Sequence, residues 1–306
     1  MKDDKPSSTA LLIGKSILMS SADDIVSPLI PKAMVSYTRE FIRAAYGNWT
    51  VRILEILGSL KVTWAIVRFA ERLTVPGMIV HYILRKRRLE EWLTTTLDDG
   101  VRQLIVIGAG LDTLGIRSAE KYKNINVLEI DHPATQSIKR KAVDFGFIKQ
   151  PENFEMLACD LSKVSLGDAL RLSKRVNDST STMFVAEGLF MYLSKEDVAG
   201  TISILKKFPL GSTFAFSYMQ LDENKRPAFC NQGALTTSWL DRKRERFVWG
   251  ESTIGIETFV RVLGLHVKDQ FSGDDLYTKY LALTTKEKLV TARGENFVSV
   301  ALRPEN

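Results

Sequence analysis

Glycine and acidic side chains follow four apolar segments of this 306-residue chain. Glycine lets a backbone adopt positive φ and approach a ligand closely, and a carboxylate accepts strong hydrogen bonds from hydroxyl and amino groups. Both features suit the binding of a nucleotide-like cofactor at the carboxyl ends of parallel strands. The residues concerned are Gly108 and Gly110 after the run 103–107, Glu129 and Asp131, Asp160, and Glu187.

The spacing of these residues bears on which cofactor is bound. Thr113 stands where a dinucleotide-binding Gly-x-Gly-x-x-Gly motif has its third glycine. Glu129 and Asp131 could accept the ribose hydroxyls of either a dinucleotide or S-adenosylmethionine. Asp160 is followed by Leu161, a pair that could bind an adenine amino group and pack on its ring. Dinucleotide folds have no general need for this acid, so the pattern favours S-adenosylmethionine.

A basic cluster, Arg85-Lys86-Arg87-Arg88, precedes the first of these segments. Arginine offers a bidentate fork for a carboxylate such as that of a methionine moiety. Glu187 could bind the ammonium group of the same moiety or be structural. No aromatic interleaving or nucleic-acid module accompanies the cluster, so we expect no nucleic-acid partner.

The elements that must position these residues alternate in type. Strand patterns at 103–110, 125–132, 154–161, 182–193 and 212–219 are separated by segments of helical length, which predicts a parallel sheet with helices on both faces. Two more strands, 265–271 and 296–303, could form a hairpin. The segment 51–73 predicts an amphipathic helix or a pair broken near Gly58, and 78–97 predicts another helix.

Composition and charge are those of an ordinary globular protein. The chain is 45% hydrophobic and 25% charged, with a net charge of +6, which weakly favours an anionic ligand. Two distant cysteines, Cys159 and Cys230, predict neither a disulfide framework nor a metal site. The N-terminal segment does not have a signal-peptide pattern, and no stretch has the length of a membrane span. We therefore expect a cytoplasmic protein.

These motifs together resemble the leucine carboxyl methyltransferase family, and in particular its bacterial and polyketide-tailoring O-methyltransferases. The resemblance covers about residues 85–220. The motifs that carry it are Arg85-Lys86-Arg87, "QLIVIGAGLDT" at 103–113, "EIDHP" at 129–133 with Lys139 or Lys141 downstream, "CDL" at 159–161 and "EGLFMYL" at 187–193.

The resemblance implies an α/β fold with a Rossmann-like, seven-stranded sheet of the class I methyltransferase type. We expect a single domain over 1–306, in which a helical cap over 1–98 precedes an α/β core over 99–306. It also implies an S-adenosylmethionine site, which would include Arg85, Gly108, Gly110, Asp112, Glu129, Asp131, Asp160, Leu161 and Glu187. Leu114 stands where the family commonly has arginine, whereas Arg117 is retained, and Lys32 is the candidate for the family's N-terminal lysine.

The expected reaction is direct methyl transfer to a carboxylate of a small molecule. A carboxylate is already ionised at neutral pH, so this acceptor needs no general base, and none of the three histidines is an evident base. No catalytic residue is assigned. Tyr192 and Tyr218 are candidate substrate contacts, and the arginine- and aromatic-rich segment 240–250 could bind an anionic substrate.

Two alternatives remain open at this point. An NAD-dependent oxidoreductase would account for the glycine turn and the acids of the second strand, but not for Asp160 or "EGLFMYL". The second alternative is a non-catalytic homologue that binds S-adenosylmethionine, and it is slightly favoured by Leu114, which stands where the family commonly has arginine. The sequence does not indicate the methyl acceptor or the oligomeric state.

Overall fold

The structure is a computed structural model that describes residues 6–230, 232, 236, 246–282 and 289–303. Its seven strands have the order β3-β2-β1-β4-β5-β7-β6. The predicted α/β class and strand count are therefore confirmed. The chain divides into two compact units, each built from two separate segments, and each unit is described by itself. The single-domain organisation stays a prediction.

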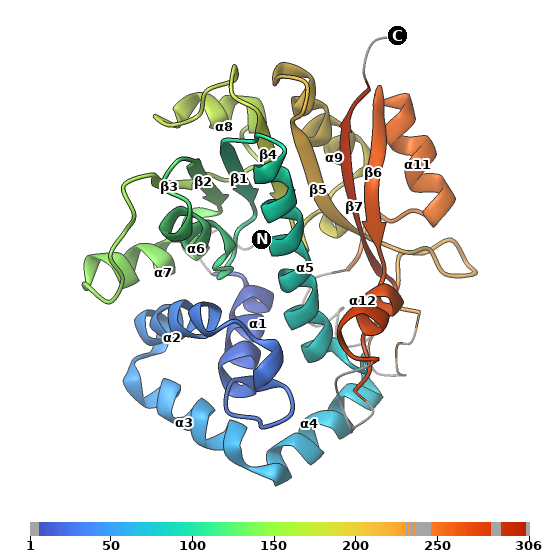
Figure 1. Ribbon diagram of the computed structural model, residues 1–306. Helices are drawn as coiled ribbons and strands as arrows, with labels where there is room; N and C mark the ends of the chain where they lie inside the picture. The colour runs from blue at the N-terminus through green and yellow to red at the C-terminus, as the bar shows by residue number, and fades with distance from the viewer. Residues whose placement is uncertain (1–5, 231, 233–235, 237–245, 283–288, 304–306) are drawn as a thin grey trace. The chain divides into compact units, whose positions relative to one another are not determined.

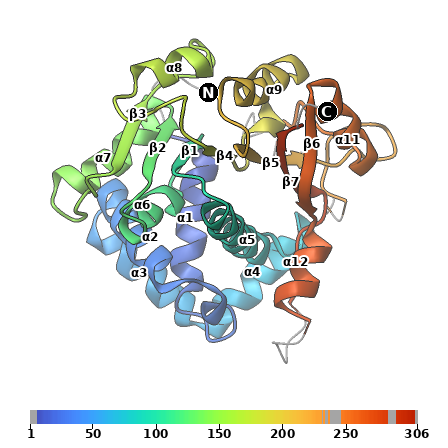
Figure 2. The same ribbon diagram turned by 45° about the horizontal axis from the view of Figure 1, so that its top comes forward.

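The first unit comprises residues 1–64 and 102–177. Its strands are parallel and lie in the order β3, β2, β1. Helices α6 and α7 pack on these strands, and α2 packs on α6 and α7 (Figures 1 and 2). The elements are α1 (Ser8–Ser20), the 3-10 helix η1 (Ser27–Leu29), α2 (Lys32–Tyr46), α3 (Asn48–Ser59), β1 (Gln103–Ile107), α6 (Leu114–Lys121), β2 (Asn126–Asp131), α7 (Pro133–Asp144), β3 (Phe154–Ala158) and α8 (Leu166–Leu172).

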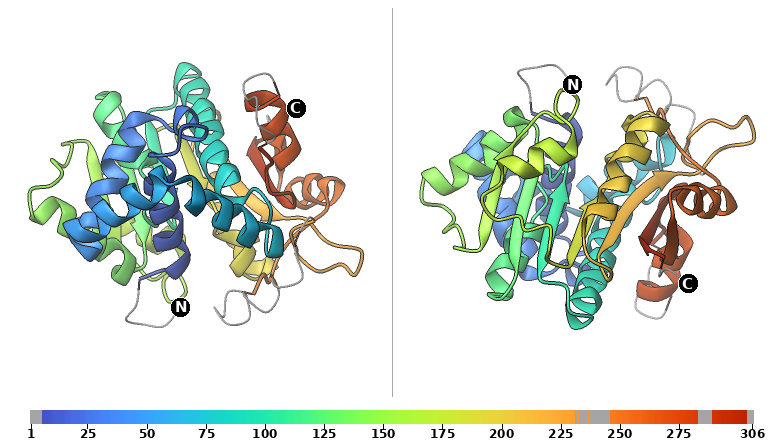
Figure 3. Two further views of the ribbon diagram at one scale, coloured as in Figure 1. Left: turned by 90° about the horizontal axis from the view of Figure 1, so that it is seen from below. Right: turned by 90° about the horizontal axis from the view of Figure 1, so that it is seen from above.

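The second unit comprises residues 65–101 and 178–306. Strand β5 pairs with β4 in parallel and with β7 antiparallel, and β7 pairs antiparallel with β6. Figure 3 gives two further views of these strands and of α11 and α12, which both contact β6. The elements are α5 (Met78–Asp98), β4 (Thr182–Ala186), η2 (Phe190–Tyr192), α9 (Lys195–Ile202), η3 (Ser203–Lys207), β5 (Thr213–Met219), α11 (Thr253–Val262), β6 (Leu265–Phe271), α12 (Gly273–Tyr280) and β7 (Glu295–Leu302).

Three sequence predictions about the elements need correction. The sheet is mixed rather than parallel, because β7 runs opposite to its two neighbours. The last two strands pair, but α12 lies between them in the chain, so they do not form a simple hairpin. The fourth strand ends at Ala186 and is followed by the short helix η2, because Gly188 adopts a φ of 66° there.

The predicted break near Gly58 is confirmed. Helix α3 ends at Ser59, Leu60 is extended, and α4 (Lys61–Leu73) begins at the next residue. A Cβ added to Gly58 would lie 2.0 Å from the backbone oxygen of Met19, so only glycine allows α3 to pack this closely on α1. The Trp64 indole donates to the Gly58 carbonyl at 2.7 Å, which fixes the start of α4.

Local sequence explains where several helices begin. Ser165, Ser194, Ser252 and Ser272 each precede a helix and accept a hydrogen bond from a backbone N–H of its first turn. These caps replace the intrahelical partners that the first N–H groups lack. At Ser194, for example, the Asp197 N–H donates to the serine hydroxyl at 3.1 Å.

Candidate cofactor site

The glycine turn after β1 is held by the end of β2. Gly108 and Gly110 both have positive φ, 66° and 54°, a conformation that glycine adopts without strain. The Gly108 N–H donates to the Ile130 carbonyl at 2.8 Å, and the Gly110 N–H donates to a carboxylate oxygen of Asp131. Asp112 continues the turn by accepting from the Leu114 N–H at 2.6 Å. The turn and the start of α6 are therefore set by backbone bonds to two carboxylates.

Asp131 ends β2 and uses both oxygens locally. One oxygen accepts from Gly110, and the other accepts from the N–H of His132 at 2.6 Å. Burial raises the pKa of the Asp131 carboxyl, while the Gly110 and His132 N–H groups oppose this shift. Each carboxylate oxygen has two lone pairs, so capacity for a further donor is left.

Glu129, two residues earlier on the same face of β2, lies fully buried. One of its oxygens accepts from the ammonium of Lys139 at 2.6 Å, and this lysine is buried too. The other oxygen lies where a side chain on Gly115 would be, 2.5 Å from an added Cβ. Burial raises the pKa of the Glu129 carboxyl, and the Lys139 charge opposes that shift. Of the two lysines that the motif left open, Lys139 is the partner, whereas Lys141 is exposed.

Asp160 lies two residues beyond the end of β3. The Ser162 hydroxyl donates to it at 2.6 Å, the Ser162 N–H donates at 3.0 Å, and the Lys163 ammonium lies 3.3 Å away. These bonds, led by that of the Ser162 hydroxyl, lower the pKa of Asp160 to about 2. Its neighbour Leu161 is half-buried. Asp160 is therefore a charged acceptor at neutral pH, with an apolar side chain beside it.

Leu114, the departure from the family pattern, begins α6 and is buried. It fills an apolar position that an arginine could occupy only by burying its charge. The retained Arg117 lies one turn later, and its Nε donates to the Thr113 hydroxyl at 2.9 Å. Leu114 therefore packs in the interior, and Arg117 binds Thr113, the threonine of the motif.

In the second unit, Arg85 of α5 joins two carboxylates. Its Nε donates to Glu187 at 2.6 Å, and its Nη1 donates to Glu295 at 2.5 Å. Lys86 also donates to Glu187, at 3.0 Å, and His81 lies 3.1 Å from Glu295. The two carboxylates thus have three basic neighbours from α5. Burial raises the pKa of the Glu295 carboxyl, but the Arg85 charge together with the contacts of His81 and Ser217 outweighs burial, so the pKa is lowered.

The turn after Glu187 brings a second backbone group to this cluster. Gly188 has a φ of 66°, and its N–H donates to the Ser217 hydroxyl of β5 at 2.8 Å. A side chain at Gly188 would begin 3.4 Å from Nη2 of Arg85, so glycine leaves room on that side of the guanidinium.

The two tyrosines proposed as substrate contacts have different surroundings. Tyr192 ends η2, is half-buried, and packs against Phe247 with the ring centroids 5.9 Å apart. Tyr218 is only 1% exposed and lies beside Trp249, and burial raises the pKa of its phenol to about 12. Substrate roles for both residues stay predictions.

The other residues considered at the outset have these positions. Lys32 is exposed at the start of α2. Arg87 stacks over the Tyr280 ring, and Arg88 pairs with Asp269 at 2.7 Å. Of the segment 240–250, residues 240–245 lie outside the described residues.

The predicted site residues thus form two clusters, one in each unit. The first contains the glycine turn, Asp112, Glu129, Asp131 and, through the neighbouring strand, Asp160; the second contains Arg85 and Glu187. Sequence reasoning did not assign Gly115, Lys86, His81 or Glu295. Lys86 had a visible signal in the basic cluster, and Glu295 had one as the carboxylate that stands two residues before the apolar residues of β7. The cofactor roles of all these residues stay predictions.

Residues 26–206, more than half of the chain, match the family model described as "Leucine carboxyl methyltransferase". The chain belongs to the leucine carboxyl methyltransferase family. The resemblance seen in the motifs is therefore confirmed, and the dinucleotide alternative gains no support from the match.

Curated relatives of this family member match part of the chain. A Bacillus subtilis protein named "Putative S-adenosyl-L-methionine-dependent methyltransferase YktD" is 31% identical over 137 residues, which are 44% of each chain. A Mycolicibacterium vanbaalenii protein with the same general name is 30% identical over 123 residues, 40% of this chain and 41% of that protein. The matched region thus spans less than half the length of these relatives.

One solved structure bears on the fold. A "duf574 family protein" from Streptomyces avermitilis superposes with a TM-score of 0.55 at 15% identity, and the match covers 87% of this chain and 96% of that one. This likeness supports the Rossmann-like architecture.

The described residues contain no group of three or more His, Cys, Asp or Glu side chains placed to hold a metal ion. None of their helices combines the length and apolarity that crossing a bilayer requires.

Proposed function

We propose that this family member is an S-adenosylmethionine-dependent methyltransferase that methylates a carboxylate of a small molecule. The observation that carries the proposal is the family match over 26–206 together with the glycine turn bound to Asp131. The names of the curated relatives support the same cofactor. A reducing, cytoplasmic setting is part of the proposal and agrees with the two free cysteines.

The residues of the first unit suit the adenosine part of this cofactor. Asp131 has lone pairs left for the ribose hydroxyls after binding its two N–H groups. Asp160, whose pKa is about 2, would accept from the adenine amino group as a full anion, and Leu161 could pack on the ring. Glu129 is held by Lys139 and would act mainly by fixing β2 and α6.

The residues of the second unit suit the methionine part. Arg85 uses two of its three nitrogens in the bonds to Glu187 and Glu295, and Gly188 leaves space beside the third. A cofactor carboxylate could bind to Nη2, and Glu187 could bind the cofactor ammonium. Lys86 would hold Glu187 in position.

The chemistry proposed needs no proton transfer. The cofactor supplies an electrophilic methyl group on a sulfonium. An acceptor carboxylate oxygen forms a bond to the methyl carbon as the carbon–sulfur bond breaks, and that electron pair stays on sulfur as a thioether. The protein's main contribution is to hold oxygen, carbon and sulfur in line. Two of the histidines have local partners, His81 at Glu295 and His132 as the N-cap of α7, which agrees with an acceptor that needs no base.

Calorimetry with S-adenosylhomocysteine tests the cofactor assignment. We expect binding by the wild type and a loss of about tenfold or more for Asp131→Asn and for Asp160→Asn, because each removes a charged acceptor. Asp168→Asn is the matched control, since Asp168 is exposed and pairs with Arg171 and Ser165 at α8, away from the predicted site residues. Unchanged binding in both site variants, or no binding by wild type, contradicts the assignment.

A methyl-labelled cofactor and a panel of small carboxylic acids test the reaction. Label in the product that alkali releases indicates a methyl ester, whereas alkali-stable label indicates an ether and rules out the carboxylate acceptor. Cofactor binding without transfer to any metabolite extract would identify a non-catalytic homologue. Thermal stabilisation by NAD but not by S-adenosylmethionine would instead support an oxidoreductase.

A further inference from the structure

Two buried residues of the second unit, His81 and Glu295, meet Arg85 at a single carboxylate oxygen. Oε2 of Glu295 lies 2.5 Å from Nη1 of Arg85 and 3.1 Å from Nε2 of His81. His81 and Arg85 are four residues apart in α5, so their side chains lie on the same face of that helix. Glu295 is the first residue of β7, and this oxygen therefore ties α5 to the sheet.

The sheet presents Glu295 and its neighbours on one face. Phe297 follows Glu295 at i+2, and Ser217 of β5 is the register partner of Phe297, so the three side chains point to the same side. The His81 ring packs beside Phe297, with the ring centroids 6.2 Å apart. The Ser217 hydroxyl accepts from the Gly188 N–H at 2.8 Å. The turn at Gly188 and the carboxylate of Glu295 are therefore set by the same pair of strands, β5 and β7.

The direction of these hydrogen bonds follows from the charge of Glu295. The pKa of its carboxyl is lowered to about 2, so the group is ionised at neutral pH and only accepts hydrogen bonds. Nε2 of His81 and Nη1 of Arg85 therefore both donate. His81 thus restrains the carboxylate, and the carboxylate restrains the guanidinium.

Holding the Arg85 guanidinium at two nitrogens fixes the direction of the third. The group is planar, and its N–H bonds leave it in fixed directions. Nε donates to Glu187 at 2.6 Å, Nη1 donates to Glu295 at 2.5 Å, and the Tyr82 ring centroid lies 4.7 Å from the central carbon. Nη2 has no hydrogen bond within the described part of the chain, and a Cβ on Gly188 would begin 3.4 Å from it.

Burial separates the residues that a ligand could contact from those that it could not. The side chains of His81 and Glu295 are 0% and 1% exposed, against 5% for Arg85 and 9% for Glu187. His81 and Glu295 therefore present almost no surface to a bound molecule. Any effect that they have on binding is exercised through Arg85.

We propose that Glu295 and His81 are positioning residues for the cofactor. They hold the Arg85 guanidinium so that Nη2 meets the carboxylate of the methionine moiety, and neither of them touches the cofactor. This inference rests on the proposed function, because it takes the ligand to be S-adenosylmethionine. Without Glu295, Arg85 keeps one fixed nitrogen instead of two, and Nη2 can turn away from the cofactor carboxylate. The loss should then concern the amino acid part of the ligand and spare the adenosine part.

Calorimetry of the full chain with two ligands tests this assignment. S-adenosylhomocysteine carries the amino acid part, whereas methylthioadenosine has the same adenosine and a thioether without it. We expect Glu295→Gln to weaken S-adenosylhomocysteine binding about tenfold or more, which corresponds to the loss of one charge-assisted hydrogen bond, and to leave methylthioadenosine binding unchanged. His81→Leu should have a smaller effect of the same kind. His81→Gln should bind as the wild type does, because its amide can still donate to Glu295.

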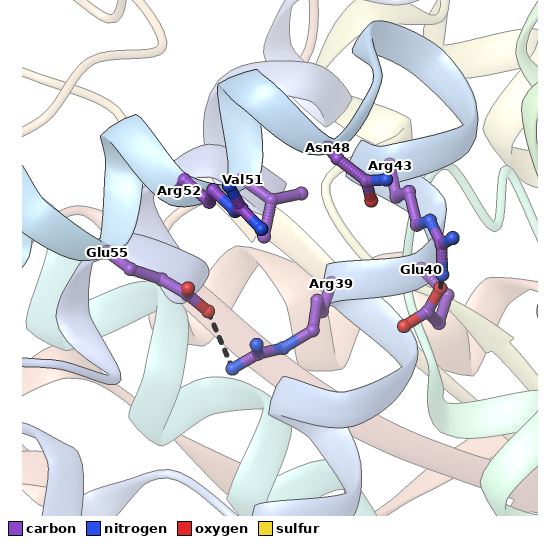
Figure 4. Close-up of a pocket in the computed structure, with 7 residues that line it drawn as sticks. All are labelled: Arg39, Glu40, Arg43, Asn48, Val51, Arg52 and Glu55. Atoms are coloured by element: carbon purple, nitrogen blue, oxygen red, sulfur yellow. Dashed lines mark hydrogen bonds and ion pairs between the residues drawn. The ribbon is translucent and has the colours of Figure 1, made fainter.

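Two control variants break arginine–carboxylate pairs that contain none of the predicted site residues. Glu91→Gln removes a partner of Arg88 on the same helix, α5. Glu55→Gln removes the partner of Arg39 at a cavity of about 350 Å³ that residues of α2 and α3 line (Figure 4). Both variants should bind the two ligands as the wild type does.

The outcomes separate this inference from the proposed function. Wild-type protein and Glu295→Gln that bind S-adenosylhomocysteine equally well overturn the inference alone. So does an equal loss of both ligands in every variant, since that indicates general damage to the fold. If Glu295→Gln does not fold, equal binding of S-adenosylhomocysteine by His81→Leu and His81→Gln overturns the inference instead. Absence of S-adenosylhomocysteine binding by the wild type overturns the proposed function and the inference with it.

Discussion

Replacing Gly115 by alanine tests whether Glu129 is fixed as the structure describes. The added Cβ would lie 2.5 Å from a carboxylate oxygen of Glu129, and 2.8 and 3.0 Å from its Cγ and Cδ. Glu129 has little room to move away, because it is fully buried and bound to Lys139 at 2.6 Å. The Glu129 side chain therefore meets the added Cβ and is at the same time held in place by Lys139.

The size of the effect follows from two opposing contributions. Alanine in place of glycine inside a helix stabilises by about 1 kcal/mol. Forcing an extra carbon into a packed interior costs about 1–3 kcal/mol, and occasionally more. We therefore expect Gly115→Ala to be neutral or destabilising by up to about 2 kcal/mol. The matched control is Gly200→Ala in α9, where an added Cβ meets nothing within 4 Å and should stabilise by about 1 kcal/mol.

Equilibrium urea unfolding measures the difference between the two variants. The contact predicts that Gly115→Ala is less stable than Gly200→Ala by about 1–3 kcal/mol. Shortening the acid relieves the contact, so Glu129→Asp should cost less in the Gly115→Ala background than in the wild type. Equal stabilisation by both alanines, or identical costs of Glu129→Asp in both backgrounds, would refute the reasoning.

Four further changes probe other contacts. Lys139→Met leaves the buried Glu129 carboxylate without its cation and should destabilise the folded protein by about 3–5 kcal/mol at neutral pH. Because the pKa of Glu129 is raised, this loss of stability should become smaller as the pH falls, which urea titrations at several pH values would show. Gly58→Ala places a Cβ 2.0 Å from a backbone oxygen of α1, so it should lower the melting temperature by more than Gly115→Ala or Gly200→Ala does. Arg85→Met leaves two buried carboxylates without their shared cation and should cost about 3–5 kcal/mol in urea unfolding, with loss of S-adenosylhomocysteine binding in calorimetry. The folded-state pKa of Asp160 is lowered from 3.8 to about 2, so its stabilising contribution is present above pH 4 and is lost as the pH falls towards 2; Asp160→Asn should lack that part of the acid dependence of unfolding.

The sequence predicted the parts of the fold that rest on local pattern. Strand β1 and its glycine turn were readable because β-branched residues run directly into a Gly-x-Gly spacing. The break between α3 and α4 was readable from Gly58. These features depend on residues close together in the chain, where periodicity and turn chemistry act.

The partners of the buried charges were not readable in the same way. Glu129 and Asp131 look equivalent in sequence, yet only Glu129 is paired with a buried lysine, since Lys139 reaches it from α7. Arg85 pairs with Glu295, which lies 210 residues later in the chain, and no local sequence pattern encodes this pairing. The reversal of β7 likewise depends on pairing with β5 and β6 rather than on its own residues.

The interleaving of the two units has a consequence for synthesis on the ribosome. The first unit has all its residues once the chain reaches 177, whereas the second needs 65–101 together with residues from 178 onward. Helix α5 therefore cannot complete its packing while residues 102–177 are being synthesised. During that time Arg85 and Lys86 lack the carboxylates that they bind in the folded protein. We expect the nascent chain to complete its units in this order, with α5 as the segment most in need of a chaperone's protection.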